Sequence, residues 1–155
     1  MKKYMIEALK EAHTAAKKGE VPVGAVIVKD GQIISRAHNL TETLNDPTAH
    51  AEMLAIRQAG AESGWSRLKG CEMYVTLEPC AMCAGAIVWA RIEKLYIGTM
   101  DPKAGACGSV MNIVQNEKLN HRVEMECGIM KEECAARLRE FFAQRRKNNK
   151  KQMEE

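Results

Sequence analysis

The sequence predicts one layered α/β domain in which helices cover a central mixed sheet. Segments with helical spacing of apolar residues alternate with short β-rich runs along most of the chain. The first two β-rich runs are joined by an Asp-Gly turn, and such a hairpin makes the sheet mixed rather than purely parallel. The chain has 155 residues, 46% of them hydrophobic and 28% charged, which is enough to bury one core.

Local signals set the expected elements of the first half. Gly19 ends the first apolar-periodic run, Asp30-Gly31 forms the turn of the hairpin, and Asp46-Pro47-Thr48 marks the start of a second helix. The complete expected order is helix 2–18, strands 21–28 and 33–38, helix 49–60, strand 73–77, helix 80–89, strands 94–98 and 123–126, and helix 131–146.

The second half is organised around Pro79, which disfavours helix at Glu78 and suits the first turn of the helix that follows. Residues 99–120 contain several Gly and Ala and are expected to form a loop with a short helix at about 110–114. The last helix is amphipathic, and the tail 147–155 is expected to fray. Together these elements form a single domain, residues 1–155, without repeats or linkers.

Charge is concentrated at the C-terminal end. From Arg137 onward there are seven Lys or Arg and three acids, so this segment has a net charge of +4. The whole chain has a net charge of +3, so the rest of it is near −1. A basic helix suits a phosphate-rich partner. A solvated helix with a frayed tail explains the same charges equally well.

Cysteine usage predicts a reducing compartment. The chain has six cysteines, no export signal and no apolar run long enough to span a membrane, so we expect a cytoplasmic protein with free thiols. Only Cys80 and Cys83 have metal-ligand spacing. The other four are expected to be small buried apolar groups: Cys71, Cys107, Cys127 and Cys134.

Cys80 and Cys83 are three residues apart at the predicted start of a helix, so both sulfurs can face one point. Helix N-terminal amides lower thiol pKa, and the thiolate is the form that binds metal. Because the chain lacks a second Cys pair, His50 is the candidate third ligand. Two sulfurs, one imidazole and an open fourth position are typical of a catalytic rather than a structural Zn²⁺ site.

Glu52 is the candidate proton carrier, provided that its helix begins beside His50. Residues two apart on a regular helix point nearly opposite ways, about 200° around the axis. The two side chains can therefore share a site only at a helix start, which Pro47-Thr48 predicts. Glu52 would then act as general acid and base without binding the metal.

Alternative interpretations exist for each part. A lone Cys-x-x-Cys could be a thioredoxin-like redox pair, and His50 or Glu52 alone would most often be an ordinary polar residue. Together, His-x-Glu followed by Pro-Cys-x-x-Cys is the pattern of zinc-dependent deaminases that act on bases of nucleic acids.

With this pattern, the chain resembles the bacterial tRNA-specific adenosine deaminases of the cytidine deaminase-like superfamily. The resemblance rests on these stretches: 21–26, 46–52, 76–80, 101–109, 119–123 and Phe141-Phe142. It implies a three-layer α/β/α sandwich with a five-stranded mixed sheet, one Zn²⁺ per subunit and a homodimer. It also implies hydrolytic conversion of adenosine to inosine at the wobble position of an arginine tRNA.

The resemblance further implies substrate contacts outside the metal motif. Asn39 looks like the residue that hydrogen-bonds the flipped purine. The residues implied for neighbouring nucleotides of the anticodon loop are Asp101, Lys103, His121 and Phe142. Two rival functions stay open at this point: a deaminase of the same superfamily acting on guanine, cytosine or a nucleoside such as cytidine, and a non-enzymatic, zinc-stabilised RNA-binding module.

Overall fold

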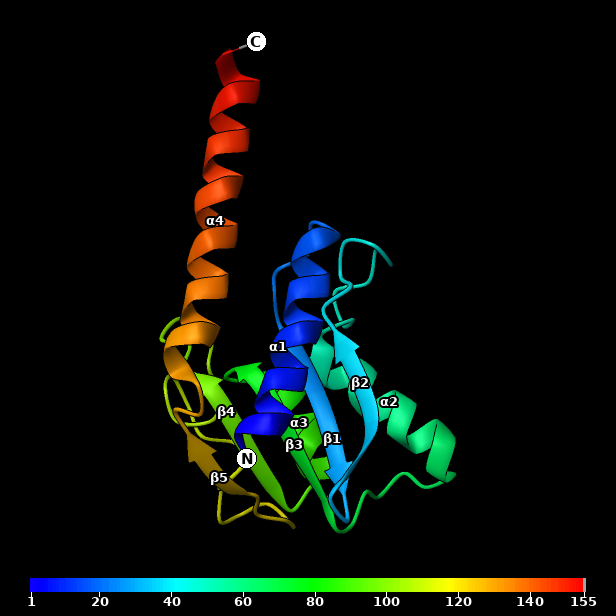
Figure 1. The fold of residues 1–155 in the computed structure, drawn as a ribbon. Coiled ribbons are helices and arrows are strands. Elements are labelled where there is room, and N and C mark those ends of the chain that lie inside the picture. The colour runs from blue at the N-terminus through cyan, green and yellow to red at the C-terminus, as the bar shows by residue number, and fades with distance from the viewer. Residues whose placement is uncertain (155) are drawn as a thin grey trace.

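A computed structural model describes residues 1–154, which form four helices and five strands (Figure 1). In chain order the elements are α1 (Lys2–Lys17), β1 (Gly24–Lys29), β2 (Gln32–His38), α2 (Ala51–Ser63), β3 (Cys71–Leu77), α3 (Ala81–Trp89), β4 (Lys94–Thr99), β5 (Glu124–Cys127) and α4 (Lys131–Glu154). The α/β class and the five-stranded sheet are therefore confirmed.

The sheet is mixed, in the order β2-β1-β3-β4-β5. Strand β1 runs antiparallel to β2 and β3, whereas β3, β4 and β5 are parallel to one another. Asp30 and Gly31 both have positive φ, 50° and 75°, as the tight turn between β1 and β2 requires. The hairpin that the sequence predicted is therefore present, with Lys29 paired to Gln32 beside the turn.

Helices cover both faces of the sheet, which gives three layers (Figure 1). Side chains alternate along each strand, so Val26 and Tyr74 pack with α1 and α4 on one face. Ile27 and Val75 lie in the larger cluster with α2 and α3 on the other face. The layer of α2 and α3 carries the site described below, because both helices begin at the same edge of the sheet.

Two segments differ from expectation. Residues 110–114 form no helix; an isolated bridge joins Cys107 and Asn112, and the amides of Val110 and Ile113 donate back to Gly105 and Ala106. These loop hydrogen bonds replace the i to i−4 pattern that a helix needs.

Helix α4 continues to Glu154, where a frayed tail was expected from residue 147. The added residues are mostly good helix formers, with no Gly or Pro to stop them. Its distal half stands clear of the body (Figure 1). No helix among residues 1–154 is both long and apolar enough to cross a membrane.

The cysteines are all free thiols. Cys71, Cys107 and Cys134 are buried as expected, but Cys127 is exposed because it ends the edge strand β5.

Candidate active site

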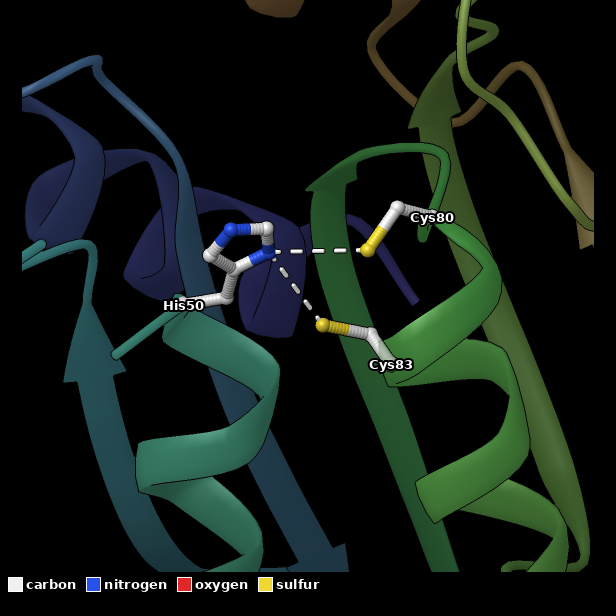
Figure 2. Close-up of side chains that lie close together, drawn as sticks. All are labelled: His50, Cys80 and Cys83. Atoms are coloured by element: carbon white, nitrogen blue, oxygen red, sulfur yellow. Dashed lines mark hydrogen bonds between the residues drawn. The ribbon is translucent and has the colours of Figure 1, made fainter. Parts of the chain in front are cut away.

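Three side chains meet where α2 and α3 begin. His50 is the N-cap of α2 and has extended backbone angles, φ −75° and ψ 153°. Cys80 is the N-cap of α3, and Cys83 lies in the first turn of that helix. Figure 2 shows the imidazole of His50 facing both sulfurs across the gap between the helices. The two helix starts thus bring together residues thirty positions apart.

The distances suit a tetrahedral metal. Nδ1 of His50 lies 3.6 Å from Sγ of Cys80 and 3.4 Å from Sγ of Cys83. With Zn–S near 2.3 Å and Zn–N near 2.0–2.1 Å, tetrahedral geometry places such N and S atoms about 3.6 Å apart. All three ligand atoms lie within 4.8 Å of one another. The donor set therefore fits Zn²⁺ with a fourth position left for water.

Cys80 is held in the thiolate form. The thiol of Cys83 and the imidazole of His50 both stabilise its charge, and they lower the pKa of Cys80 to about 3. Its place at a helix N-terminus acts in the same direction. A thiolate at neutral pH is what a metal ligand requires.

Glu52 is the second residue of α2 and only 4% exposed. Burial raises its pKa to about 7, against an ordinary value of 4.5; its own backbone N–H and the charge on His50 oppose this but do not outweigh it. Because His50 lies outside the helix and Glu52 within its first turn, both line one pocket. This is the arrangement that the helix start was expected to permit.

The pocket beside this cluster has a volume of about 260 Å³. Asn39 lines it from the end of β2, and it is 7% exposed. The amide of Asn39 makes only long contacts: its nitrogen lies 3.5 Å from the carbonyl oxygen of Val21, and its oxygen lies 3.4 Å from the amide nitrogen of Thr41. Asn39 can therefore exchange these contacts for stronger hydrogen bonds to a bound group.

Glu78 anchors the opposite wall of the pocket. Its carboxylate accepts hydrogen bonds from the backbone N–H groups of Asp101, Cys107 and Ser109, at 2.8, 2.9 and 3.0 Å, and from the hydroxyl of Ser109. Burial alone would raise the pKa of Glu78, but these donors lower it instead. Gly105 is required here, since a Cβ at that position would overlap the carboxylate. Glu78 therefore fixes the 101–109 loop.

A second, wider groove of about 910 Å³ runs from this pocket along α4. The two share Val21, Leu77 and Asp101 in their linings. Lys103 and Phe142 line the groove, Phe142 being 38% exposed. The carboxylate of Asp101 accepts hydrogen bonds from the backbone amides of residues 103 and 104, so it shapes its own loop.

His121 lies elsewhere. Its Nε2 is 2.7 Å from the carbonyl oxygen of Ile92, which precedes β4, whereas the pocket lies past the other end of that strand. A strand of six residues spans about 20 Å. Within one chain the structure brings Asn39, Asp101, Lys103 and Phe142 to the pocket or its groove, but not His121.

Sequence reasoning missed several lining residues. Glu78 was considered only for its place before Pro79, and its role depends on a loop more than twenty positions away. A buried acid at the end of an apolar strand was the one available signal. Arg139 and Arg146 were noted only as part of the total charge, although both line the groove.

A three-layer sandwich with a His/Cys/Cys cluster and a buried glutamate at two helix starts is the arrangement of the zinc-binding deaminases. Comparison with known proteins agrees. The family described as cytidine and deoxycytidylate deaminase zinc-binding region matches residues 1–99.

A tRNA-specific adenosine deaminase of Bacillus subtilis (strain 168) is 53% identical over 147 residues, covering 95% of this chain and 91% of that protein. A solved structure from studies of A-to-I editing by tRNA:A34 deaminases superposes with a TM-score of 0.86 and 46% identity, covering 89% of this chain and 100% of that one. A guanine deaminase structure from Bacillus subtilis has 42% identity and a TM-score of 0.63, covering 69% of each chain. The chain belongs to the cytidine and deoxycytidylate deaminase family and, within it, to the tRNA-specific adenosine deaminases.

Proposed function

We propose that this protein hydrolyses adenosine to inosine at the wobble position of a tRNA anticodon loop, an arginine tRNA by resemblance. The observation that carries the proposal is the meeting of His50, Cys80 and Cys83 beside Glu52, in a pocket that opens into a groove lined by basic side chains. The first part supplies the chemistry of deamination, and the second suits a polyanion rather than a free base.

His50, Cys80 and Cys83 would hold the zinc ion, which would supply an acidified water for the hydrolysis. Glu52 carries the protons: its carboxylate takes both protons of the attacking water in turn, and it delivers one to N1 of adenine and one to the departing amino group, which leaves as ammonia. A pKa near 7 allows the same carboxyl group to take up and release protons at neutral pH. Burial keeps bulk water away from that exchange.

Asn39 is the candidate for holding the base, because its amide has one donor and one acceptor side available in the pocket. The pocket is small enough for one base-sized group. An anticodon loop presents bases that are already partly unstacked, so turning one into the pocket costs less than from a duplex. Asp101, Lys103 and Phe142 would contact the neighbouring nucleotides along the groove.

The deciding experiment is incubation with an anticodon stem-loop that carries adenosine at the wobble position, scored for inosine. Free guanine, cytosine and cytidine are assayed in parallel for ammonia. Inosine in the RNA with no ammonia from the small molecules supports the proposal. Ammonia from a small molecule with no inosine in RNA would instead show a deaminase of free bases or nucleosides. The similar guanine deaminase structure is an example of that class.

The metal ligands are tested by metal analysis. Cys80→Ala and Cys83→Ala should each lose stoichiometric zinc, whereas Cys127→Ala, which removes an exposed thiol outside the cluster, should keep one zinc per chain. Unchanged zinc in either of the first two variants would remove that residue from the site.

We further propose a homodimer that buries the groove between α3 and the loop before β5. Trp89 is 76% exposed and Leu119 42% exposed, and both line this groove of about 450 Å³. Apolar side chains gathered on a surface mark an interface, and a second copy of the chain can bury the same patch by two-fold symmetry. Trp89→Glu should shift sedimentation toward a monomer.

The free thiols fit a cytoplasmic location.

A further inference from the structure

Helix α4 extends well beyond the sheet that anchors it. Its first turns pack on β4, where Gly98 leaves room for the side chain of Cys134, the one buried residue of the helix. From residue 144 onward its side chains are exposed, and Figure 1 shows this half standing clear of the body. A polar helix that continues without a packing partner suggests a surface for another molecule.

Three of the basic side chains of α4 lie on one face of the helix. Arg139, Arg146 and Lys150 follow at intervals of seven and four residues, so they lie within about 40° of one another around the axis. All three are exposed. Within residues 1–154, no carboxylate lies at ion-pair distance from any of them. We call these three residues the basic stripe.

The stripe begins in the groove beside the active site. Arg139 and Arg146 line this groove together with Phe142, and the groove meets the pocket of Glu52 at Asp101. Lys150 continues the same face past the end of the groove. Arg145 points elsewhere and lies over the ring of Phe141, 5.6 Å from its centroid. The stripe thus leads outward from the catalytic pocket.

We propose that the basic stripe binds backbone phosphates of the stem of the RNA hairpin whose loop occupies the pocket; this inference rests on the proposed function. From Arg139 to Lys150 the helix rises about 16 Å. A double-stranded nucleic acid carries one phosphate per roughly 1.7 Å of its axis, so a stem leaving the pocket along α4 offers phosphates over this whole length. Such contacts add affinity without reading sequence.

The test compares two hairpins with the same loop, one on a stem of about three base pairs and one on a stem of about eight. Affinities of the full-length protein are measured by fluorescence anisotropy over a range of salt. We expect the longer stem to bind roughly tenfold more tightly at low salt. The Arg146→Gln/Lys150→Gln variant should lose most of that preference, and its slope of log K against log salt should fall by about 2.

A matched control removes two charges at the same height on the helix. Arg145 and Lys151 lie about 120° to either side of the stripe, so Arg145→Gln/Lys151→Gln should keep the preference for the longer stem. Gln preserves helix propensity, which circular dichroism checks. Equal affinity of the unmodified protein for both hairpins, or equal losses of affinity in the two double variants, would contradict the proposed binding of the stem by the basic stripe. Inosine formation in either hairpin is scored separately, because its absence would overturn the proposed function instead.

Discussion

Two buried glutamates, Glu52 and Glu78, lie on either side of the catalytic pocket, and their surroundings shift their pKa values in opposite directions. Glu52 is 4% exposed and Glu78 2% exposed, so both have lost most of their hydration. Glu78 accepts hydrogen bonds from three backbone amides and a hydroxyl, which lower its pKa. Glu52 lacks such a set of donors, and burial raises its pKa to about 7. Hydrogen-bond donors, rather than depth of burial, therefore decide whether the pKa of a carboxyl group in this pocket is lowered or raised.

The first consequence concerns turnover. Glu52→Gln should lower the rate of deamination by about 10³-fold or more, because the amide has nearly the same shape but cannot carry a proton. Zinc should remain at one per chain, since Glu52 is not among the ligands. The measurements are inosine formation under single-turnover conditions and metal analysis. Glu62→Gln, on the exposed face of the same helix, is the control, and a fully active Glu52→Gln would remove the proton-transfer role.

For Glu78 the effect should appear in stability. Glu78→Gln replaces a carboxylate oxygen by an NH₂ group that faces amide donors, so at least one strong hydrogen bond becomes a repulsive contact. We expect the free energy of unfolding to fall by about 2–4 kcal/mol, measured in urea. Glu72→Gln, at a half-buried position in β3, the strand that ends just before Glu78 in the chain, should change it by less than about 0.5 kcal/mol. Equal stability of the two variants would mean that the loop does not depend on Glu78.

The third prediction is that a substitution at Glu52 raises the stability of the fold, whereas the substitution at Glu78 lowers it. In the unfolded chain this carboxyl titrates near 4.5, and in the folded chain near 7, so the free energy of unfolding falls as pH rises between these values. Glutamine does not ionise, so the free energy of unfolding of the variant does not fall in this way. Glu52→Gln should therefore make the zinc-free protein about 2–3 kcal/mol more stable at pH 8, and should leave it nearly unchanged at pH 4. Urea unfolding with a chelator measures both, and a variant less stable at pH 8 would contradict the raised pKa.

The two glutamates also differ in how far sequence could predict them. The meeting of His50 with Cys80 and Cys83 was predictable because each residue sits at a helix start marked by a nearby proline, Pro47 or Pro79. The same local signal placed Glu52 beside them.

Glu78 was different, because its donors come from an irregular loop at residues 101–109. Such a loop has no periodicity from which its hydrogen bonds can be derived, and the neighbouring residues 110–114 were wrongly expected to form a helix. The length of α4 was underestimated for a related reason: a charged segment without an apolar face resembles a disordered tail in sequence. Local signals thus predicted the catalytic cluster and the five strands, but not contacts between loops.

The smallest expected effect isolates one donor of Glu78. The hydroxyl of Ser109 hydrogen-bonds this carboxylate and helps to lower its pKa, so the folded state keeps its charge to lower pH than the unfolded chain does. That contribution to stability is present above pH 4.5 or so and is lost as pH falls through the lowered value. Ser109→Ala should cost about 1 kcal/mol at pH 7 and should flatten the fall in stability between pH 5 and pH 3. Urea unfolding across this range, with Ser63→Ala in an exposed position as control, would contradict the assignment if the two variants followed the same curve.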